Sequence, residues 1–431
     1  MPEQTTQTRP APSRGYRWAV LLAMSVAMYG TYYAFDAIGP LAPLLSRQLN
    51  FSNSDIGLLQ ASYSLPNVFI LLAAGLIIDR MGAKNSMLLF ATFVFAGLVV
   101  GALSPRVGIM ALGRVIIGIG AESYAMATHV AIARWFLRGE LSLAFGVRTS
   151  FARLGSLSAQ TSPTWARGAY TYWQWPLLIS VGFGAVSLVG TVLYWILDRR
   201  GEKRYELGVP EHKGKFVWRD LFRFNRSFWL LAALCVTFYA CIFPFQTFGQ
   251  KFLIDARGVT PQTASLLIGM EPLFSLLFMP VFGHVVDRHG KRSLLMAVGS
   301  VLLVPVFLLL AYTSIPPIIP MVMMGVAFAL VPAILWMSIV FVVDRSRLGF
   351  ASGVVDAVQQ LGLVGTNLAI GWTNDRWLAG PGNAAGYAPG MWLFTSMAVL
   401  AVGFAIVLRR VETGPGAHGL ETIKTGGTQQ P

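Results

Sequence analysis

The chain has 431 residues, of which 55% are hydrophobic and 12% are charged. A soluble domain usually carries about 25% charged residues, so a water-soluble fold of this length would expose too much apolar surface. The two cysteines, Cys235 and Cys241, are too few for a disulfide framework or a multi-cysteine metal site. The composition therefore indicates a membrane protein.

The formal net charge of +14 reflects how the chain lies in a membrane. With the N-terminus inside, 24 of the 33 Lys and Arg residues fall in alternate loops and the two tails, 6 fall in the opposite loops, and 3 fall within helices. This bias follows the positive-inside rule. The basic residues are not gathered in one domain or stripe, so we expect contact with lipid headgroups and no nucleic-acid partner.

Residues 1–17 are polar, and the apolar run that begins at Trp18 continues past residue 40. A signal peptide has an apolar region of about 7 to 15 residues, so we expect an uncleaved first span behind a cytoplasmic tail.

A spanning helix needs about 20 mostly apolar residues, and this criterion predicts an all-α membrane protein with twelve spans. The predicted spans are 18–45, 54–78, 85–104, 108–134, 140–165, 174–197, 228–253, 262–286, 293–312, 316–343, 348–374 and 390–409.

The longest hydrophilic stretch lies between spans six and seven and is rich in Arg, Lys and Glu. We therefore predict an N-terminal six-helix bundle at 18–197, a cytoplasmic linker at 198–227, a C-terminal bundle at 228–409 and a cytoplasmic tail at 410–431.

An internal repeat relates the two halves. Gly75, Asp79, Arg80 and Gly82, followed by a basic residue, recur 208 positions later as Gly283, Asp287, Arg288 and Gly290. Two halves in parallel register imply an axis along the membrane normal and a binding site near midplane at their interface.

The pattern G-x-x-x-D-R-x-G-x-K/R between spans two and three resembles the signature loop of the major facilitator superfamily. Arg114, Gly118 and Gly120 resemble the superfamily's fourth-helix motif. The resemblance covers residues 18 to 410 and implies two pseudo-symmetric six-helix bundles around a central cavity. We expect the repeated loops, together with Arg114, to form a cytoplasmic gate, with Asp79 and Asp287 accepting hydrogen bonds from the neighbouring half. We expect Arg114 to position a helix and not to bind a ligand.

Glu122 and Arg153 are the strongest site candidates, because an ionisable group at the bilayer centre is costly and usually faces a cavity or a partner. A rise of about 1.5 Å per residue puts Glu122 roughly 18 Å and Arg153 roughly 20 Å from the cytoplasmic ends of spans four and five. Glu122 can bind an ammonium group and Arg153 a carboxylate, which suits a small zwitterion. The alternative is a structural salt bridge between the two helices.

Three other charged residues fall within the predicted spans. Asp36, near the outer end of span one, and Glu271, before Pro272, are candidates for carrying a proton. Arg148 lies five residues before Arg153, about 140° around the helix, so we expect it to face elsewhere and to latch onto Asp356.

Four segments resemble the lysosomal dipeptide uniporters within the superfamily. They are Tyr33 to Asp36 with 63–68, 120–123 through 152–156, Val236 to Phe245, and Leu335 through Gly362. The resemblance implies that Glu122 and Arg153 hold the two termini of a dipeptide. It also implies that Asp36, Trp336 and Gln360 line the cavity, where we expect Tyr33 and Asn67 as well.

The sequence departs from these uniporters in three respects. The N-terminal tail has no acidic dileucine sorting signal, the outer loops give an accessory subunit little to bind, and Glu271 is an extra carboxylate. We therefore expect a bacterial-type inner membrane, leave uniport and proton coupling open, and expect a monomer.

Two alternatives remain at this point: a proton-coupled organic-anion carrier and a nutrient sensor that binds without transporting. Glu122 argues against the first, because an anion gains nothing from a facing carboxylate. The histidines are scattered and no Walker-type loop occurs, so we expect neither an enzyme nor a cofactor or metal.

Overall fold

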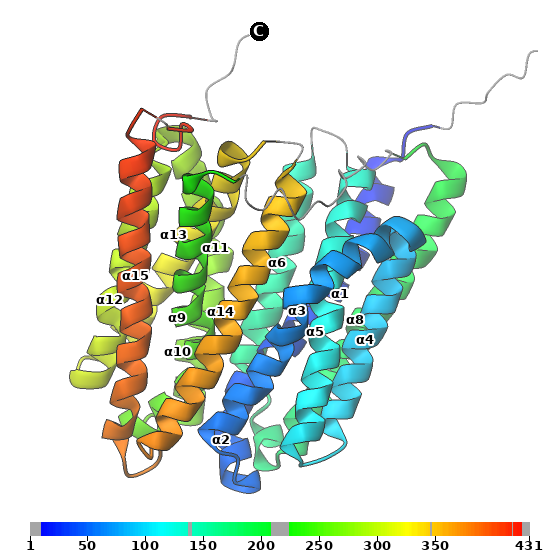
Figure 1. The fold of residues 1–431 in the computed structure, drawn as a ribbon. Helices are drawn as coiled ribbons and strands as arrows, with labels where there is room; N and C mark the ends of the chain where they lie inside the picture. Colours follow the sequence, from blue (N-terminus) through cyan, green and yellow to red (C-terminus); the bar gives the residue numbers. More distant parts are fainter. Residues whose placement is uncertain (1–9, 137–139, 208–223, 345–346, 416, 425–431) are drawn as a thin grey trace, which may run out of the picture.

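A computed structural model of the chain describes residues 10–136, 140–207, 224–344, 347–415 and 417–424. Within these ranges the secondary structure is helical, apart from one isolated bridge between Gly380 and Asn383. Figure 1 shows the long helices running side by side between two ends of the molecule. The all-α prediction is confirmed.

The first half of the chain contains six membrane-length units. The first unit is interrupted at Ala37, which ends one helix and precedes the next. The backbone of Ala37 itself keeps helical φ and ψ angles. The elements are α1 (Arg14–Asp36), α2 (Ile38–Leu49), α3 (Asn53–Met81), α4 (Ala83–Ala102), α5 (Val107–Trp135), α6 (Leu141–Gln160), α7 (Ser162–Trp165), η1 (Arg167–Thr171) and α8 (Gln174–Arg204).

The second half repeats this plan, with its own break at Gly269 in the second unit. The elements are α9 (Arg226–Arg257), α10 (Pro261–Ile268), α11 (Met270–His289), α12 (Arg292–Tyr312), α13 (Ile318–Val342), α14 (Leu348–Arg376), η4 (Ala384–Tyr387) and α15 (Ala388–Glu412).

Length and hydropathy identify the spans among the described residues. Ten helical units are long and apolar enough to cross a membrane, and α3, which bends by 62° between Ile70 and Ala73, makes eleven. The twelfth unit is α6, which has 20 residues but contains Arg148 and Arg153 within its apolar stretch. The chain is therefore a multi-pass membrane protein.

Helix contacts divide the molecule into two bundles. In the first bundle, α4 packs on α5 and α8, α1 packs on α6 and α8, and α3 packs on α5. In the second, α12 packs on α13 and α15, α11 packs on α13, and α9 packs on α14 and α15. The bundles meet through α3 with α14, α6 with α11, and α2 with α9.

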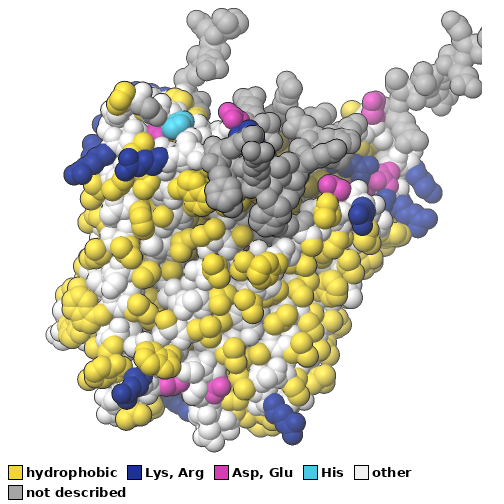
Figure 2. Space-filling model, in the orientation of Figure 1, with side chains coloured by type: hydrophobic (Ala, Val, Ile, Leu, Met, Phe, Trp, Pro, Cys, Tyr) yellow, Lys and Arg dark blue, Asp and Glu magenta, His cyan; other side chains and the backbone are white. Residues whose placement is uncertain are grey.

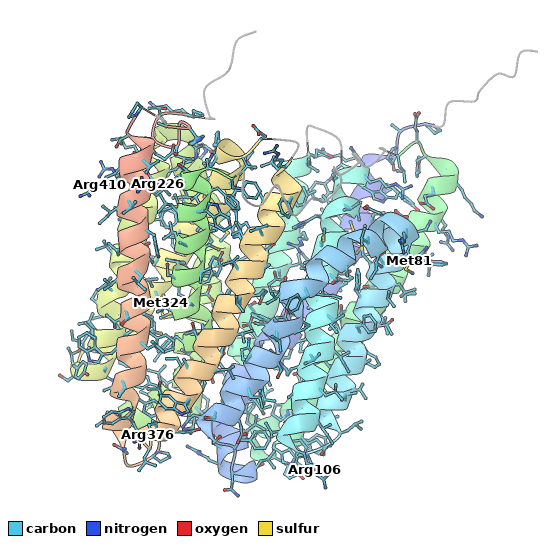
Figure 3. All side chains as sticks on the ribbon, in the orientation of Figure 1. Met81, Arg106, Arg226, Met324, Arg376 and Arg410 are labelled. Atoms are coloured by element: carbon cyan, nitrogen blue, oxygen red, sulfur yellow. The ribbon has the colours of Figure 1, made fainter. Side chains whose placement is uncertain are left out.

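The two ends of the molecule differ in the parts of the chain that they carry. Met81, Arg226 and Arg410 lie at one end, here called the termini end, and Arg106 and Arg376 lie at the opposite, distal end (Figure 3). Figure 2 shows a broad hydrophobic surface between the two ends, with charged side chains gathered toward each end. This belt is the surface that a bilayer would cover.

The two bundles are joined at the distal end. Asp375 on α14 accepts hydrogen bonds from the backbone amides of Asn53 (2.8 Å) and Ser54 (2.7 Å), which begin α3. Gln250 on α9 donates to the Gln160 carbonyl on α6 at 2.8 Å. Thr164 on α7 also shares a hydrogen bond of 2.8 Å with Ser265 on α10, while the upper part of α3 bends away from α14 (Figure 1).

Helix α8 extends further than the sequence predicted. It continues to Arg204, so residues 198–204 of the predicted linker are helical. The reason is that this charged turn packs against α4 and α5: Asp198 accepts a hydrogen bond from Trp135 at 2.6 Å, and Glu202 pairs with Lys84 and Arg134. Helices α1 and α9 likewise begin at 14 and 226, before the predicted 18 and 228, and most of the linker lies outside the described residues.

The repeated loops end helices in the same way in both bundles. Gly82 (φ 76°) and Gly290 (φ 69°) terminate α3 and α11 with a backbone that favours glycine. Gly75 and Gly283 precede them within the helices, where both are partly buried. These loops lie at the termini end, where Figure 3 labels Met81, the residue before Gly82.

One contact of the repeated loops lies within its own bundle. Asp287 pairs with Arg292 of the second bundle at 3.4 Å, while Asp79, Arg80 and Arg288 are exposed. A latch between these loops and the opposite bundle stays a prediction.

Gly57 provides a test of the distal contact. A Cβ added there would lie 2.4 Å from the Asn367 carbonyl oxygen on α14, so Gly57→Ala forces the bundles apart or strains them. Overpacking typically costs about 1–3 kcal/mol. We expect a clear fall in the melting temperature of the purified protein. Gly101→Ala is the control, because nothing lies within 4 Å of its added Cβ. Equal melting temperatures for the two variants would contradict the tight distal contact.

Candidate functional site

Glu122 lies on α5 and is partly buried. Its Oε1 accepts a hydrogen bond from the Tyr63 hydroxyl on α3 at 3.0 Å. The guanidinium of Arg148 and the carboxyl of Asp356 are close enough to interact with it electrostatically. Asp356 belongs to α14, so Glu122 is near the second bundle as well as its own.

Arg153 lies on α6 and faces the second bundle. Its guanidinium carbon is 5.1 Å from the centroid of the Phe328 ring on α13, a cation–π contact between the two halves. Its Nε is buried without a hydrogen-bond partner. Arg153 is therefore a cation at the interface between the bundles, and its Nε–H can still donate a hydrogen bond.

The alternative of a structural salt bridge is not what the structure contains. Among the described residues, no ion pair joins Glu122 to Arg153 or either of them to another side chain. The Tyr32 side chain on α1 is close enough to both to interact electrostatically. The carboxylate and the guanidinium are thus separate from each other, with Tyr32 near both.

Asp36 and Glu271 come together from opposite bundles, although they are 235 positions apart in sequence. Asp36 ends α1 and accepts a hydrogen bond from Gln160 at 3.4 Å, and Glu271 in the first turn of α11 accepts one from Gln246 on α9. The two carboxyls interact electrostatically with each other and with Arg153.

A small polar cavity of about 10 Å³, roughly the room that one water molecule needs, lies beside Asp36, between the bundles. Its lining comprises Phe35, Asp36, Gly39, Gln60, Gln160, Phe243, Gln246 and Thr247.

Arg114 does not lie at the termini end, which corrects its grouping with the cytoplasmic gate, but its contacts agree with the helix-positioning role expected of it. It lies in the second turn of α5, which begins near the distal end, and it is buried. It donates hydrogen bonds to the carbonyls of Ala34 (2.8 Å) and Phe35 (3.0 Å) and to the Gln60 side chain (2.7 Å). These carbonyls are at the end of α1, where the helix ladder is interrupted, so Arg114 fixes the position of Asp36.

The predicted latch between Arg148 and Asp356 is also wrong for this conformation. Arg148 is buried within the first bundle, and its Nη2 contacts the Met28 sulfur at 3.6 Å. It lies within electrostatic reach of Glu122, Tyr32 and Arg153. Long side chains bring the two arginines into one neighbourhood despite their angular separation on α6.

The second bundle contributes an aromatic wall. The indole of Trp336 on α13 donates to the Tyr239 hydroxyl on α9 at 3.1 Å, and Tyr239 is within electrostatic reach of Arg153 and Asp356. Two further candidates are buried with an oxygen that lacks a hydrogen-bond partner: Gln360 on α14 and Asn67 on α3. The Asn67 amide donates to the Tyr63 carbonyl of its own helix at 3.0 Å.

Tyr33 does not lie beside Glu122 and Arg153. Its ring stacks on Phe183 of α8, with centroids 4.0 Å apart, and it also contacts Trp165. This face of α1 packs inside the first bundle, whereas Tyr32 is directed toward Glu122 and Arg153. The neighbour of Glu122 and Arg153 is thus Tyr32, the residue before the predicted one.

Sequence reasoning missed four neighbours of the charged groups: Tyr32, Tyr63, Gln246 and Phe328. Tyr32 precedes Asp36 by four residues, and Tyr63 precedes Asn67 by the same interval, so the helical spacing offered a signal for both. Gln246 and Phe328 carried no such signal, because their proximity depends on how the bundles meet.

Comparison with known families agrees with this architecture. The family model described as Major Facilitator Superfamily matches residues 20–367 and, in a second match, residues 243–423. The chain belongs to the major facilitator superfamily.

Individual relatives are transporters. The human lysosomal dipeptide transporter MFSD1 is 31% identical over 380 residues, which cover 84% of this chain and 81% of that protein. A galacturonate transporter from Dickeya chrysanthemi is 24% identical over 316 residues, covering 68% of this chain and 90% of its own. The sequence resemblance to the dipeptide transporter branch is thereby confirmed.

A solved structure shows the same fold. The bacterial homologue of the human lysosomal transporter Spinster, in an inward-facing and unoccupied conformation, aligns with a TM-score of 0.73 at 17% identity. The alignment covers 93% of this chain and 98% of that one. The predicted major facilitator fold is confirmed.

The different roles of the two arginines can be tested by conservative replacement. Arg114→Lys removes the planar fork that binds two carbonyls and an amide, and an unsatisfied buried acceptor costs about 1–3 kcal/mol. We expect a marked fall in melting temperature. Arg153→Lys, the control, replaces a residue held by one ring contact and should leave the melting temperature almost unchanged. An equal loss in both variants would contradict the scaffolding role of Arg114.

Proposed function

We propose that this protein carries small zwitterionic peptides, above all dipeptides, across a membrane by alternating access. The observation that supports this most is the pair Glu122 and Arg153, which lie on neighbouring helices at the junction of the bundles and form no ion pair with any residue that the structure describes. An unpaired buried charge is costly, so its persistence favours a ligand that completes it.

A dipeptide supplies the complementary charges at its two ends. Its ammonium group can bind Glu122, whose second oxygen is not engaged by Tyr63, and its carboxylate can bind Arg153 bidentately. The aromatic groups between and beside them, Tyr32 and Phe328, can contact the peptide backbone and side chains. The relationship to MFSD1 supports the same substrate class.

Alternating access is supported by the two-bundle architecture. Hydrogen bonds join the bundles at the distal end, as expected of a carrier whose site is closed on that side. The interruptions at Ala37 and Gly269 lie beside Asp36 and Glu271, and discontinuous helices near a midplane site are common in transporters. We place the termini in the cytoplasm of a bacterial-type inner membrane and propose that one chain suffices.

An organic-anion carrier is the second candidate. Arg148 lies within electrostatic reach of Arg153, and the similarity to a galacturonate transporter points the same way. Two guanidiniums could bind a dicarboxylate or a sugar acid. Glu122 opposes this candidate, because it would repel such a ligand.

Thermal stabilisation of the purified protein tests the peptide site. Dipeptides and tripeptides should raise the melting temperature, while single amino acids and galacturonate do so weakly. Glu122→Gln and Arg153→Ala should each reduce the apparent affinity at least tenfold, since each removes a charged hydrogen-bonding partner. Matched controls are Glu206→Gln and Arg106→Ala, which remove a carboxylate and a guanidinium outside the site. If both site variants bind dipeptides like the parent, the assignment is wrong.

Counterflow in liposomes separates a carrier from a sensor. Vesicles preloaded with unlabelled dipeptide should accumulate labelled dipeptide, and the Arg153→Ala protein should not. Binding without counterflow would contradict transport and favour a sensor.

A further inference from the structure

The carboxyls of Asp36 and Glu271 have no direct role in the peptide binding proposed above. Each carboxyl lies at a helix break where the two bundles meet. Asp36 is at the break between α1 and α2, and Glu271 comes just after the break between α10 and α11. Both are buried, with 8% and 2% of their surface exposed. Among the described residues, neither forms an ion pair.

The hydrogen bonds of the two carboxyls leave at least one oxygen atom where a proton can bind. Glu271 uses one oxygen to accept from Gln246, and its other oxygen, Oε1, is buried without a partner. Asp36 accepts a long bond of 3.4 Å from Gln160, beside the polar cavity that Gln246 also lines. A buried carboxylate oxygen that accepts no hydrogen bond is costly as an anion, and a bound proton would remove that charge.

The charged groups that face this pair are few. Arg153 on α6 interacts electrostatically with both carboxyls. Arg114 on α5 also interacts with Asp36, but it donates its hydrogen bonds to Ala34, Phe35 and Gln60. The hydrogen-bonding neighbours from α6 and α9 are neutral, namely the glutamines and Ser156. From α1, Tyr32 lies within electrostatic reach of Asp36. Arg153 is therefore the one guanidinium whose charge serves both the carboxyl pair and, by the proposed function, the substrate.

We propose that Glu271, together with Asp36, is a proton-binding site that is loaded when the substrate carboxylate engages Arg153. This inference rests on the proposed peptide function. The substrate carboxylate takes up the positive charge that otherwise faces Glu271, and a buried carboxylate that loses its counter-charge is stabilised by binding a proton. By linkage, the proton in turn strengthens peptide binding, so the two move together.

The carboxyl pair also connects proton binding to the distal contact between the bundles. Gln160 bonds to Asp36 and, across the bundles, accepts a bond from Gln250. Gln246, which donates to Glu271, packs its carbonyl against Gly39, where an added Cβ would lie 2.5 Å away. Protonation of the pair changes hydrogen bonds within the contact that must open for release on the other side.

Calorimetry in two buffers measures the coupling directly. Dipeptides with uncharged side chains, which keep their charged amino and carboxyl ends, are titrated into the purified protein at pH 8 in phosphate and in Tris, whose ionisation enthalpies differ. We expect the difference in binding heat to correspond to uptake of roughly one proton per peptide beyond the fraction that the peptide's own amino group takes up at this pH. In Glu271→Gln the peptide should still bind, and the buffer dependence should fall to that amino-group fraction. Glu206→Gln is the control and should behave like the parent.

The outcomes distinguish the two proposals. Peptide binding in the parent protein with no proton uptake beyond the amino-group fraction contradicts proton coupling and leaves the peptide function intact. Unchanged proton uptake in Glu271→Gln contradicts the assignment to this pair. Absence of any binding heat contradicts the peptide function, and the coupling with it. If the Glu271→Gln protein does not fold, the parent's buffer dependence and the Asp36→Asn variant decide, since the latter should also lower proton uptake.

Discussion

The hydrocarbon interior of a membrane does not solvate ions, and this constraint organises the molecule. Each charged group within the spans must find a partner or lie where a ligand can supply one. Arg114 is satisfied by carbonyls at the break of α1, and Asp198 by Trp135 and nearby cations. Glu122 and Arg153 have no ion-pair partner among the described residues and lie where the bundles meet. The charges that the fold leaves unsatisfied are thus gathered at the site.

The two bundles make this arrangement compatible with movement. Their distal contact combines hydrogen bonds and close backbone approaches, such as Asp375 at the start of α3 and Gly57 against Asn367, with an apolar cluster to which both bundles contribute. The breaks at Ala37 and Gly269 lie next to Asp36 and Glu271. A change in the charge of these carboxyls would therefore act where the helices can bend.

The sequence predicted the architecture well because hydropathy and internal repetition are local signals. The spans, the two halves and the superfamily followed from the apolar runs and the repeated loop at Gly75 and Gly283. The position of side chains around a helix was harder to predict. Tyr33 was chosen although Tyr32 is directed toward the charged groups, since the rotation of α1 depends on its contacts with other helices. The meeting of Asp36 with Glu271 depends on how two bundles dock, which no local pattern encodes.

A structure of the protein with a bound dipeptide tests the central claim most directly. The account predicts that the peptide lies between the bundles, with its amino group within hydrogen-bonding distance of Glu122 and its carboxylate within that distance of Arg153. A peptide bound elsewhere, or Glu122 and Arg153 paired with each other while the peptide is present, would contradict it.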